Sequence, residues 1–151
     1  MSSIISGIFE FYKELPYQIP ELPIERFIVK ESSMIIGQSR NLVRLAGLSG
    51  AVAVAMAAYG AHSFRDAGSK ETMKLKKVFE SGNKMHLVHS VALLGCPLTR
   101  RPILVGTLLS LGIVVFSGSC YVNALTGNQR VRLIMPYGGM AFILAWLAML
   151  L

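Results

Sequence analysis

The residues best suited to chemistry in this sequence are its three histidines, which lie in or beside two apolar segments. His62 closes the first segment, and His86 and His89 are three positions apart in the second, so they share one face of a helix. Neutral imidazoles at such spacing can bind zinc or a haem iron. No HExxH or CxxC motif accompanies them, and no carboxylate or thiol stands at a matching distance. We therefore predict no metal site, no cofactor and no catalytic residue, because a nucleophile with a base and an orienting group is also missing.

Other polar residues are expected to lie near these histidines, toward the same ends of the predicted helices. The predicted polar cluster consists of Tyr59, His62, Asn83, His86, His89, Tyr121 and Asn123. We expect a hydrogen-bonded cap close to one membrane interface, where polar groups cost little. Two alternatives stay open: a site for the head of a lipid, a quinone or a partner protein, and a metal or redox centre.

The composition indicates what kind of elements must hold these groups. Hydrophobic residues make up 53% of the 151 residues and charged residues 15%, against about 45–50% and about 25% in soluble domains. Such a chain is too apolar to be disordered. The net charge of +7 is spread over short segments between apolar runs. A nucleic-acid site needs a clustered basic face, so we expect no nucleic-acid partner and take the lipid bilayer as the first partner.

Four apolar segments predict four membrane-spanning helices. They cover residues 42–62, 75–97, 102–125 and 132–151. About 20 apolar residues suffice to cross the hydrocarbon core. The second segment is the weakest, and we expect its helix to begin near Glu71, with lysines reaching up to the headgroups. The predicted fold class is all-α, an integral membrane four-helix bundle formed by a transmembrane domain over residues 41–151.

Small residues mark the faces through which these helices are expected to pack. Helices in lipid gain little from hydrophobicity against one another, so close backbone approach holds them together. The first segment carries small residues on two faces, which predicts a central helix with neighbours on both sides. The predicted packing residues are Gly47, Ala51, Ala55, Gly118, Gly138 and Gly139.

Residues 1–40 differ from the rest and are predicted to be an N-terminal extension. Apolar residues near the start recur at helical spacing and predict a short amphipathic helix, and Pro16, Pro20 and Pro23 favour an extended connector after it. A helix that lies on a membrane surface is rich in Lys and Arg, and this one is not. We expect it to dock on a protein partner, with a loosely ordered tail as the alternative. The predicted docking residues are Ile4, Ile8, Phe11, Tyr12 and Leu15.

Several stretches of the sequence resemble a known family of small membrane proteins. They are L-x-G-L-S-G-A-x-A-V at 45–54, Tyr59-Gly60-Ala61-His62, F-E-S-G-N-K-x-H-L-V-H-S-V-A-L-L at 79–94, F-S-G-S-x-Y at 116–121 and P-Y-G-G-x-x-F-I-L-A-W at 136–146. In this order they are similar to the family known as domain of unknown function 423, and above all to its animal branch. The resemblance covers about residues 42–151. It implies a four-span membrane protein without an established reaction, in a mitochondrial setting for the animal branch, and it supplies no catalytic residue.

These observations together predict a non-enzymatic multi-pass membrane protein of the mitochondrial inner membrane. We expect it to be a structural or accessory component of a larger, respiratory-type complex, with that complex and a bound lipid as its partners. A small oligomeric transporter or channel is the first alternative. Transport paths usually carry ionisable groups near the bilayer midplane, and the sequence predicts none there. A metal or redox membrane protein built on the histidines is the second alternative.

Overall fold

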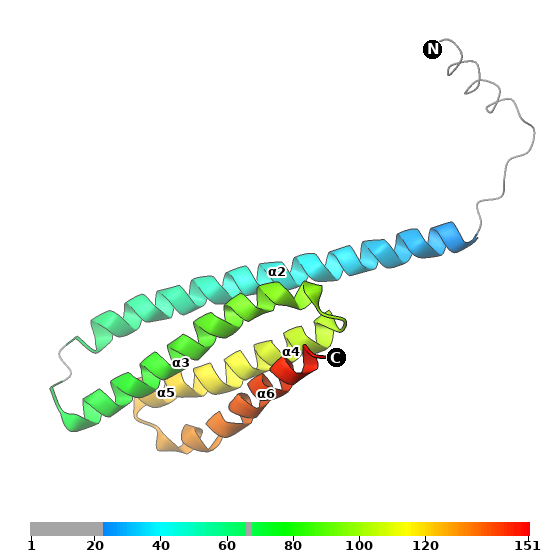
Figure 1. The fold of residues 1–151 in the computed structure, drawn as a ribbon. Helices are drawn as coiled ribbons and strands as arrows, with labels where there is room; N and C mark the ends of the chain where they lie inside the picture. The colour runs from blue at the N-terminus through cyan, green and yellow to red at the C-terminus, as the bar shows by residue number, and fades with distance from the viewer. Residues whose placement is uncertain (1–22, 66–67) are drawn as a thin grey trace, which may run out of the picture. The chain divides into compact units, whose positions relative to one another are not determined.

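The computed structural model describes residues 23–65 and 68–151, and all regular elements within them are helical (Figure 1). The elements are α2 (Pro23–Ser63), α3 (Lys70–Gly95), η1 (Cys96–Leu98), α4 (Pro102–Gly112), η2 (Ile113–Ser117), α5 (Gly118–Thr126), η3 (Gln129–Leu133) and α6 (Met135–Ala148). This confirms the all-α membrane fold that the sequence predicts. The chain divides into two compact units, residues 1–35 and 36–151. The predicted amphipathic helix and its docking residues lie outside the described residues.

The helix of the first span is longer than predicted. α2 begins at Pro23, whose fixed φ and missing N–H suit the first turn of a helix, and it continues to Ser63. The sequence prediction placed residues up to 40 in an extension with an extended connector. In the structure the part from Pro23 onward belongs instead to the same helix as the span, because no further proline or glycine pair interrupts it.

Three helices are long and apolar enough to cross a membrane. They are Ser39–Ser63, Pro102–Thr126 and Gln129–Ala148, and they match the first, third and fourth predicted spans. α3 is a helix of 26 residues, but lysines and glutamates fill its first half. It begins at Lys70 after a capping box between Ser69 and Thr72, and it ends just before Pro97. These ends agree with the predicted start near Glu71 and the predicted end at that proline.

The third span contains a π-helical turn that the sequence did not predict. α4 and α5 continue one into the other through η2, where the N–H of Gly118 bonds to the carbonyl of Ile113, five residues earlier. A π-turn adds one residue to a helical turn and is frequent at functional sites. Both α3 and α6 pack against this span and its η2 turn (Figure 1). The α4–η2–α5 span is therefore the central element of the bundle, and the prediction that the first helix is central was wrong.

The core lies where α4, α6 and the end of α3 meet. Its largest fully buried side chains are Leu93, Leu109 and Val105. At one predicted packing residue the approach is very close: Gly138 of α6 lies against the backbone of Phe116, where a side chain would not fit. Its neighbour Gly139 is also near Phe116.

In the part of the chain that the structure describes, the other predicted packing residues do not lie at helix contacts. Gly47, Ala51 and Ala55 are exposed on α2, and Gly118 has open space where a Cβ would stand. The small residues of α2 that pack are buried and recur every seven residues, which is two helical turns. They are Ala46, Ala53 and Gly60.

Candidate functional site

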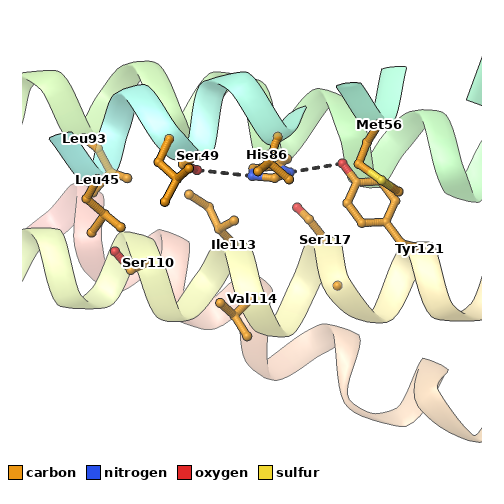
Figure 2. Close-up of a pocket in the computed structure, with 13 residues that line it drawn as sticks. Leu45, Ser49, Met56, His86, Leu93, Ser110, Ile113, Val114, Ser117 and Tyr121 are labelled. Atoms are coloured by element: carbon orange, nitrogen blue, oxygen red, sulfur yellow. Dashed lines mark hydrogen bonds between the residues drawn. The ribbon is translucent and has the colours of Figure 1, made fainter. Parts of the chain in front are cut away.

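Hydrogen bonds join α2, α3 and α5 around His86. Its Nε2 is 3.2 Å from the hydroxyl of Ser49, and its Nδ1 is 3.2 Å from the hydroxyl of Tyr121 (Figure 2). Asn83 donates to the hydroxyl of Tyr121 over 3.0 Å and to the carbonyl of Ala53 over 2.7 Å. Three helices are thereby connected through one buried imidazole.

The partners of this network fix the direction of each hydrogen bond. Ser90 donates its hydroxyl to the carbonyl of His86 over 2.8 Å, so Ser49 must donate in the 2.6 Å bond between the two serine hydroxyls. Ser49 can then only accept from His86, which makes Nε2 the protonated nitrogen of a neutral ring. Nδ1 accepts from Tyr121, whose oxygen in turn accepts from Asn83. Every donor in the network is satisfied, as burial in a bilayer demands.

The network lies near mid-length of the spans and not at their ends. Ser49 is close to the middle of the Ser39–Ser63 span, and His86 bonds to it. The polar cluster was expected at one end of the helices, and the structure places Asn83 and His86 beside the middle of the first span.

His89 takes part in a different contact. Its Nδ1 donates to the carbonyl of Met85 over 2.7 Å, and its Nε2 accepts from the indole N–H of Trp146 over 3.2 Å. The ring stacks on Phe142, with centroids 3.6 Å apart and planes at 13°. His89 thus holds α6 against α3, while His86 faces α2 and α5.

The remaining predicted cluster residues do not join the network. His62 is exposed and Tyr59 is 52% exposed. Asn123 donates to the carbonyl of Asn128 over 2.9 Å and closes the turn after α5. Of the predicted cluster, the structure brings together Asn83, His86 and Tyr121. In the described part of the chain, no three His, Cys, Asp or Glu side chains are grouped so that they could hold a metal ion.

Sequence reasoning missed the serines that complete the site. Ser49 and Ser90 bond directly to the network, and Ser117 lies beside it. The predicted polar cluster did not include them. A usable signal was their depth, since a serine near the middle of an apolar span needs a hydrogen-bond partner.

A pocket of about 410 Å³ opens between α2 and the α4–η2–α5 span, with the network along one side (Figure 2). Its apolar lining comes from Leu45, Leu48, Val52, Met56, Leu93, Ile113 and Val114, beside Gly118, and its polar lining from Ser49, His86, Ser110, Ser117 and Tyr121. No lysine, arginine, aspartate or glutamate lines it. Leu48 and Val114 are 66% and 70% exposed, so the pocket opens sideways on a surface that lipid would cover.

Ser117 is the exceptional residue of this pocket. It is fully buried, and its hydroxyl is the one buried side-chain polar atom without a hydrogen-bond partner in the part of the chain that the structure describes. Three other hydroxyls, those of Ser90, Ser110 and Thr126, donate to the carbonyl four residues earlier. Ser117 ends the π-turn, and Figure 2 shows its hydroxyl directed into the pocket between Ile113 and Tyr121.

The fold and this site define a small helical integral membrane protein with an uncharged pocket inside its spans. The chain belongs to the family described as protein of unknown function DUF423, whose sequence profile matches residues 56–139. This confirms the resemblance seen in the sequence. No solved structure matches the chain.

Bacterial relatives cover most of the bundle. A UPF0382 membrane protein of Staphylococcus saprophyticus is 34% identical over 112 residues, which are 71% of this chain and 91% of the relative. A UPF0382 membrane protein of Bacillus subtilis is 30% identical over 110 residues, 68% of this chain and 87% of the relative. A UPF0382 inner membrane protein of Escherichia coli K12 is 32% identical over 120 residues, 74% of this chain and 88% of the relative. The chain is thus an integral membrane protein.

Proposed function

We propose that this protein is a non-enzymatic, multi-pass accessory component of a larger respiratory-type complex in the mitochondrial inner membrane. The observation that carries the proposal is the outward face of α2, a row of exposed small residues on the side opposite its packed residues. This outward small face consists of Gly47, Ala51, Ala55 and Ala58.

The outward small face differs from the other lipid-facing surfaces of the bundle. On α6 the exposed positions are large, with Ile143, Leu144 and Leu147 about half exposed. Only 11% of the apolar window of α2 is buried within the chain, against 39% and 28% in the other two spans. Small residues allow the backbone of a second helix to come close, and this close packing drives association in lipid. These contrasts support a partner helix on α2.

The polar groups of the spans support a non-catalytic role. His86, Asn83 and Tyr121 bond to one another across helix contacts, and His89 bonds to Trp146 in the same manner. Each of these bonds joins two helices, as a structural role requires. The amphipathic helix predicted within residues 1–15 would add a second contact with the same complex.

The mitochondrial inner membrane is supported by the family relationship. The Escherichia coli relative is named an inner membrane protein, and the resemblance to the animal branch implies a mitochondrial setting. Fractionation of mitochondria into outer-membrane, inner-membrane and soluble fractions tests the location. We expect the full-length protein in the inner-membrane fraction after carbonate extraction, and recovery in any other membrane would contradict the proposal.

The accessory role is tested by filling the outward small face. The double substitution Ala51→Leu, Ala55→Leu adds bulk where a partner helix would approach, and Val91→Phe adds comparable bulk to an exposed position of α3. After solubilisation in mild detergent, native gels should show wild type and Val91→Phe in a large complex and the double variant released from it. Equal migration of all three chains with the complex would contradict a partner at this face.

A further inference from the structure

We propose that the pocket between α2 and η2 binds the head of an uncharged, carbonyl-bearing lipid of the quinone type. The hydroxyl of Ser117 donates a hydrogen bond to a carbonyl oxygen of this ligand, and the tail leaves the pocket between Leu48 and Val114. The proposal concerns binding alone and is independent of the accessory role.

The pocket contains one hydroxyl without a hydrogen-bond partner, that of Ser117, and its O–H can donate to a ligand. Ser49 donates to Ser90, Ser110 donates to the carbonyl of Gly106, and Tyr121 donates to His86. Only the Ser117 hydroxyl has no partner among the polar groups that line the pocket. Buried polar groups in proteins almost always have one, and no described residue supplies it, so an acceptor on a ligand in the pocket would complete the site.

The absence of charge around the pocket selects an uncharged ligand. No acidic or basic side chain lines it, and both ring nitrogens of His86 are already bonded. A phosphate or a carboxylate placed here would lose its water without gaining a counter-charge. This excludes the heads of phospholipids and of fatty acids. A neutral carbonyl needs only the one donor that Ser117 offers.

The depth and size of the pocket favour a quinone-like head over other neutral lipids. Ser49 and His86 lie near mid-length of the first span, several helical turns from either of its ends. A small-molecule pocket has about 300–1,000 Å³, and the volume of about 410 Å³ here suits one ring. An acyl chain of the bilayer could enter, but it has no acceptor for Ser117.

The pocket and the outward small face adjoin on α2, because Leu48 of the pocket lies two helical turns before Ala55 of that face. The pocket is lined by Leu45, Ser49 and Met56, whereas Gly47 and Ala51 point to another side of the helix and do not line it. The ligand is therefore tested by variants of η2 and α5, at Ser117 and Gly118, and the partner helix by variants of α2.

The direct test is photolabelling of the purified full-length chain in phosphatidylcholine nanodiscs. The probe is an azido-quinone with a short prenyl tail, and decyl-quinone is the unlabelled competitor. We expect label on the peptides that carry residues 45–56 and 110–121, and we expect the competitor to remove it. Hexadecane and stearate, which have a tail without a neutral carbonyl, should not compete.

Three variants locate the binding. Ser117→Ala should weaken competition by decyl-quinone at least fivefold, while Gly118→Leu should abolish labelling because its side chain enters open space beside the pocket. Ser119→Ala is the matched control, since this serine follows in sequence without lining the pocket, and it should label as wild type does. Ser117→Ala removes a hydroxyl that has no partner among the described residues. Its thermal midpoint without ligand should therefore not fall, and this result separates lost binding from lost folding.

The proposal would be overturned by labelling that persists in Gly118→Leu, or by equal competition from hexadecane or stearate. Labelling that decyl-quinone fails to displace would overturn it as well. If wild type showed no labelling at these peptides while the outward small face still bound its complex, the ligand site alone would be rejected.

Discussion

His86 and His89 lie one helical turn apart on α3, yet their rings bond to different helices. His86 bonds to Ser49 of α2 and Tyr121 of α5, and His89 accepts a hydrogen bond from Trp146 of α6. The two neutral rings are protonated on opposite nitrogens, because Nε2 of His86 donates whereas Nδ1 of His89 does. α3 is thereby fixed on two sides by two imidazoles with separate partners.

Replacing His86 should loosen the bundle by a modest amount. His86→Ala removes two ring hydrogen bonds and leaves the hydroxyl of Tyr121 without its acceptor. Interhelical hydrogen bonds in membranes average about 0.6 kcal/mol each, so we expect a loss of about 1–2 kcal/mol in the free energy of unfolding in detergent. His62→Ala, at an exposed position, is the control and should change little. Equal stability of the two variants would contradict the network.

The fluorescence of the sole tryptophan distinguishes the two histidines. Trp146 donates to His89, so His89→Ala should shift its emission, while His86→Ala should leave the emission of the folded protein unchanged. A double-mutant cycle of His89→Ala with Trp146→Phe should give a coupling free energy of about 0.6 kcal/mol. An emission shift caused by both histidine variants alike would mean that the two rings share one site.

The glycines of the bundle should differ sharply in their tolerance of a methyl group. Gly138→Ala places a Cβ against the backbone of Phe116, which cannot move aside as a flexible side chain would. We expect a loss of about 1–3 kcal/mol, the usual cost of overpacking. Gly47→Ala is the matched control, because nothing lies within 4 Å of its Cβ position. A thermal melt that ranks Gly47→Ala below Gly138→Ala would contradict this packing.

Most of the fold could be predicted from the sequence, because a helix that crosses a bilayer must have about 20 apolar residues. Pro97 correctly indicated where α3 ends, and Pro102 correctly indicated where α4 begins. The π-turn over 113–117 could not be predicted, since the choice between i→i+4 and i→i+5 hydrogen bonds depends on tertiary packing. The sequence also could not show which face of the first span packs against its neighbours. Ala53 is buried and Ala55 is exposed, although both are alanines on the same helix.

The site was less predictable than the fold, because the sequence does not show at which level the polar residues of one helix meet the next helix. The polar residues of α3 were assigned to a membrane interface because its apolar run begins near Met85. The helix begins at Lys70, in agreement with the predicted start near Glu71, but His86 meets Ser49 near the middle of the neighbouring span. Which residues of a cluster share a site depends on this alignment between helices, and a single sequence does not contain it.

The N-terminal segment can be tested apart from the bundle. Deleting residues 1–22 leaves all the described contacts in place, so the truncated chain should insert and unfold with the same midpoint as the full chain. Because the sequence predicts a docking helix in this segment, we expect weaker retention of the complex in native gels at raised detergent. Retention equal to that of the full-length chain would assign the segment no docking role.

The central claim is that this membrane protein works within a larger assembly, and its most direct test is the mass at which the endogenous protein migrates. Mitochondrial membranes solubilised in mild detergent would be separated on a native gel, and the protein would be detected by mass spectrometry along the lane. We predict a single peak at high mass, together with a constant set of inner-membrane proteins. A peak at the mass of the 16.5 kDa chain in its own micelle, with no co-migrating partner, would contradict the claim.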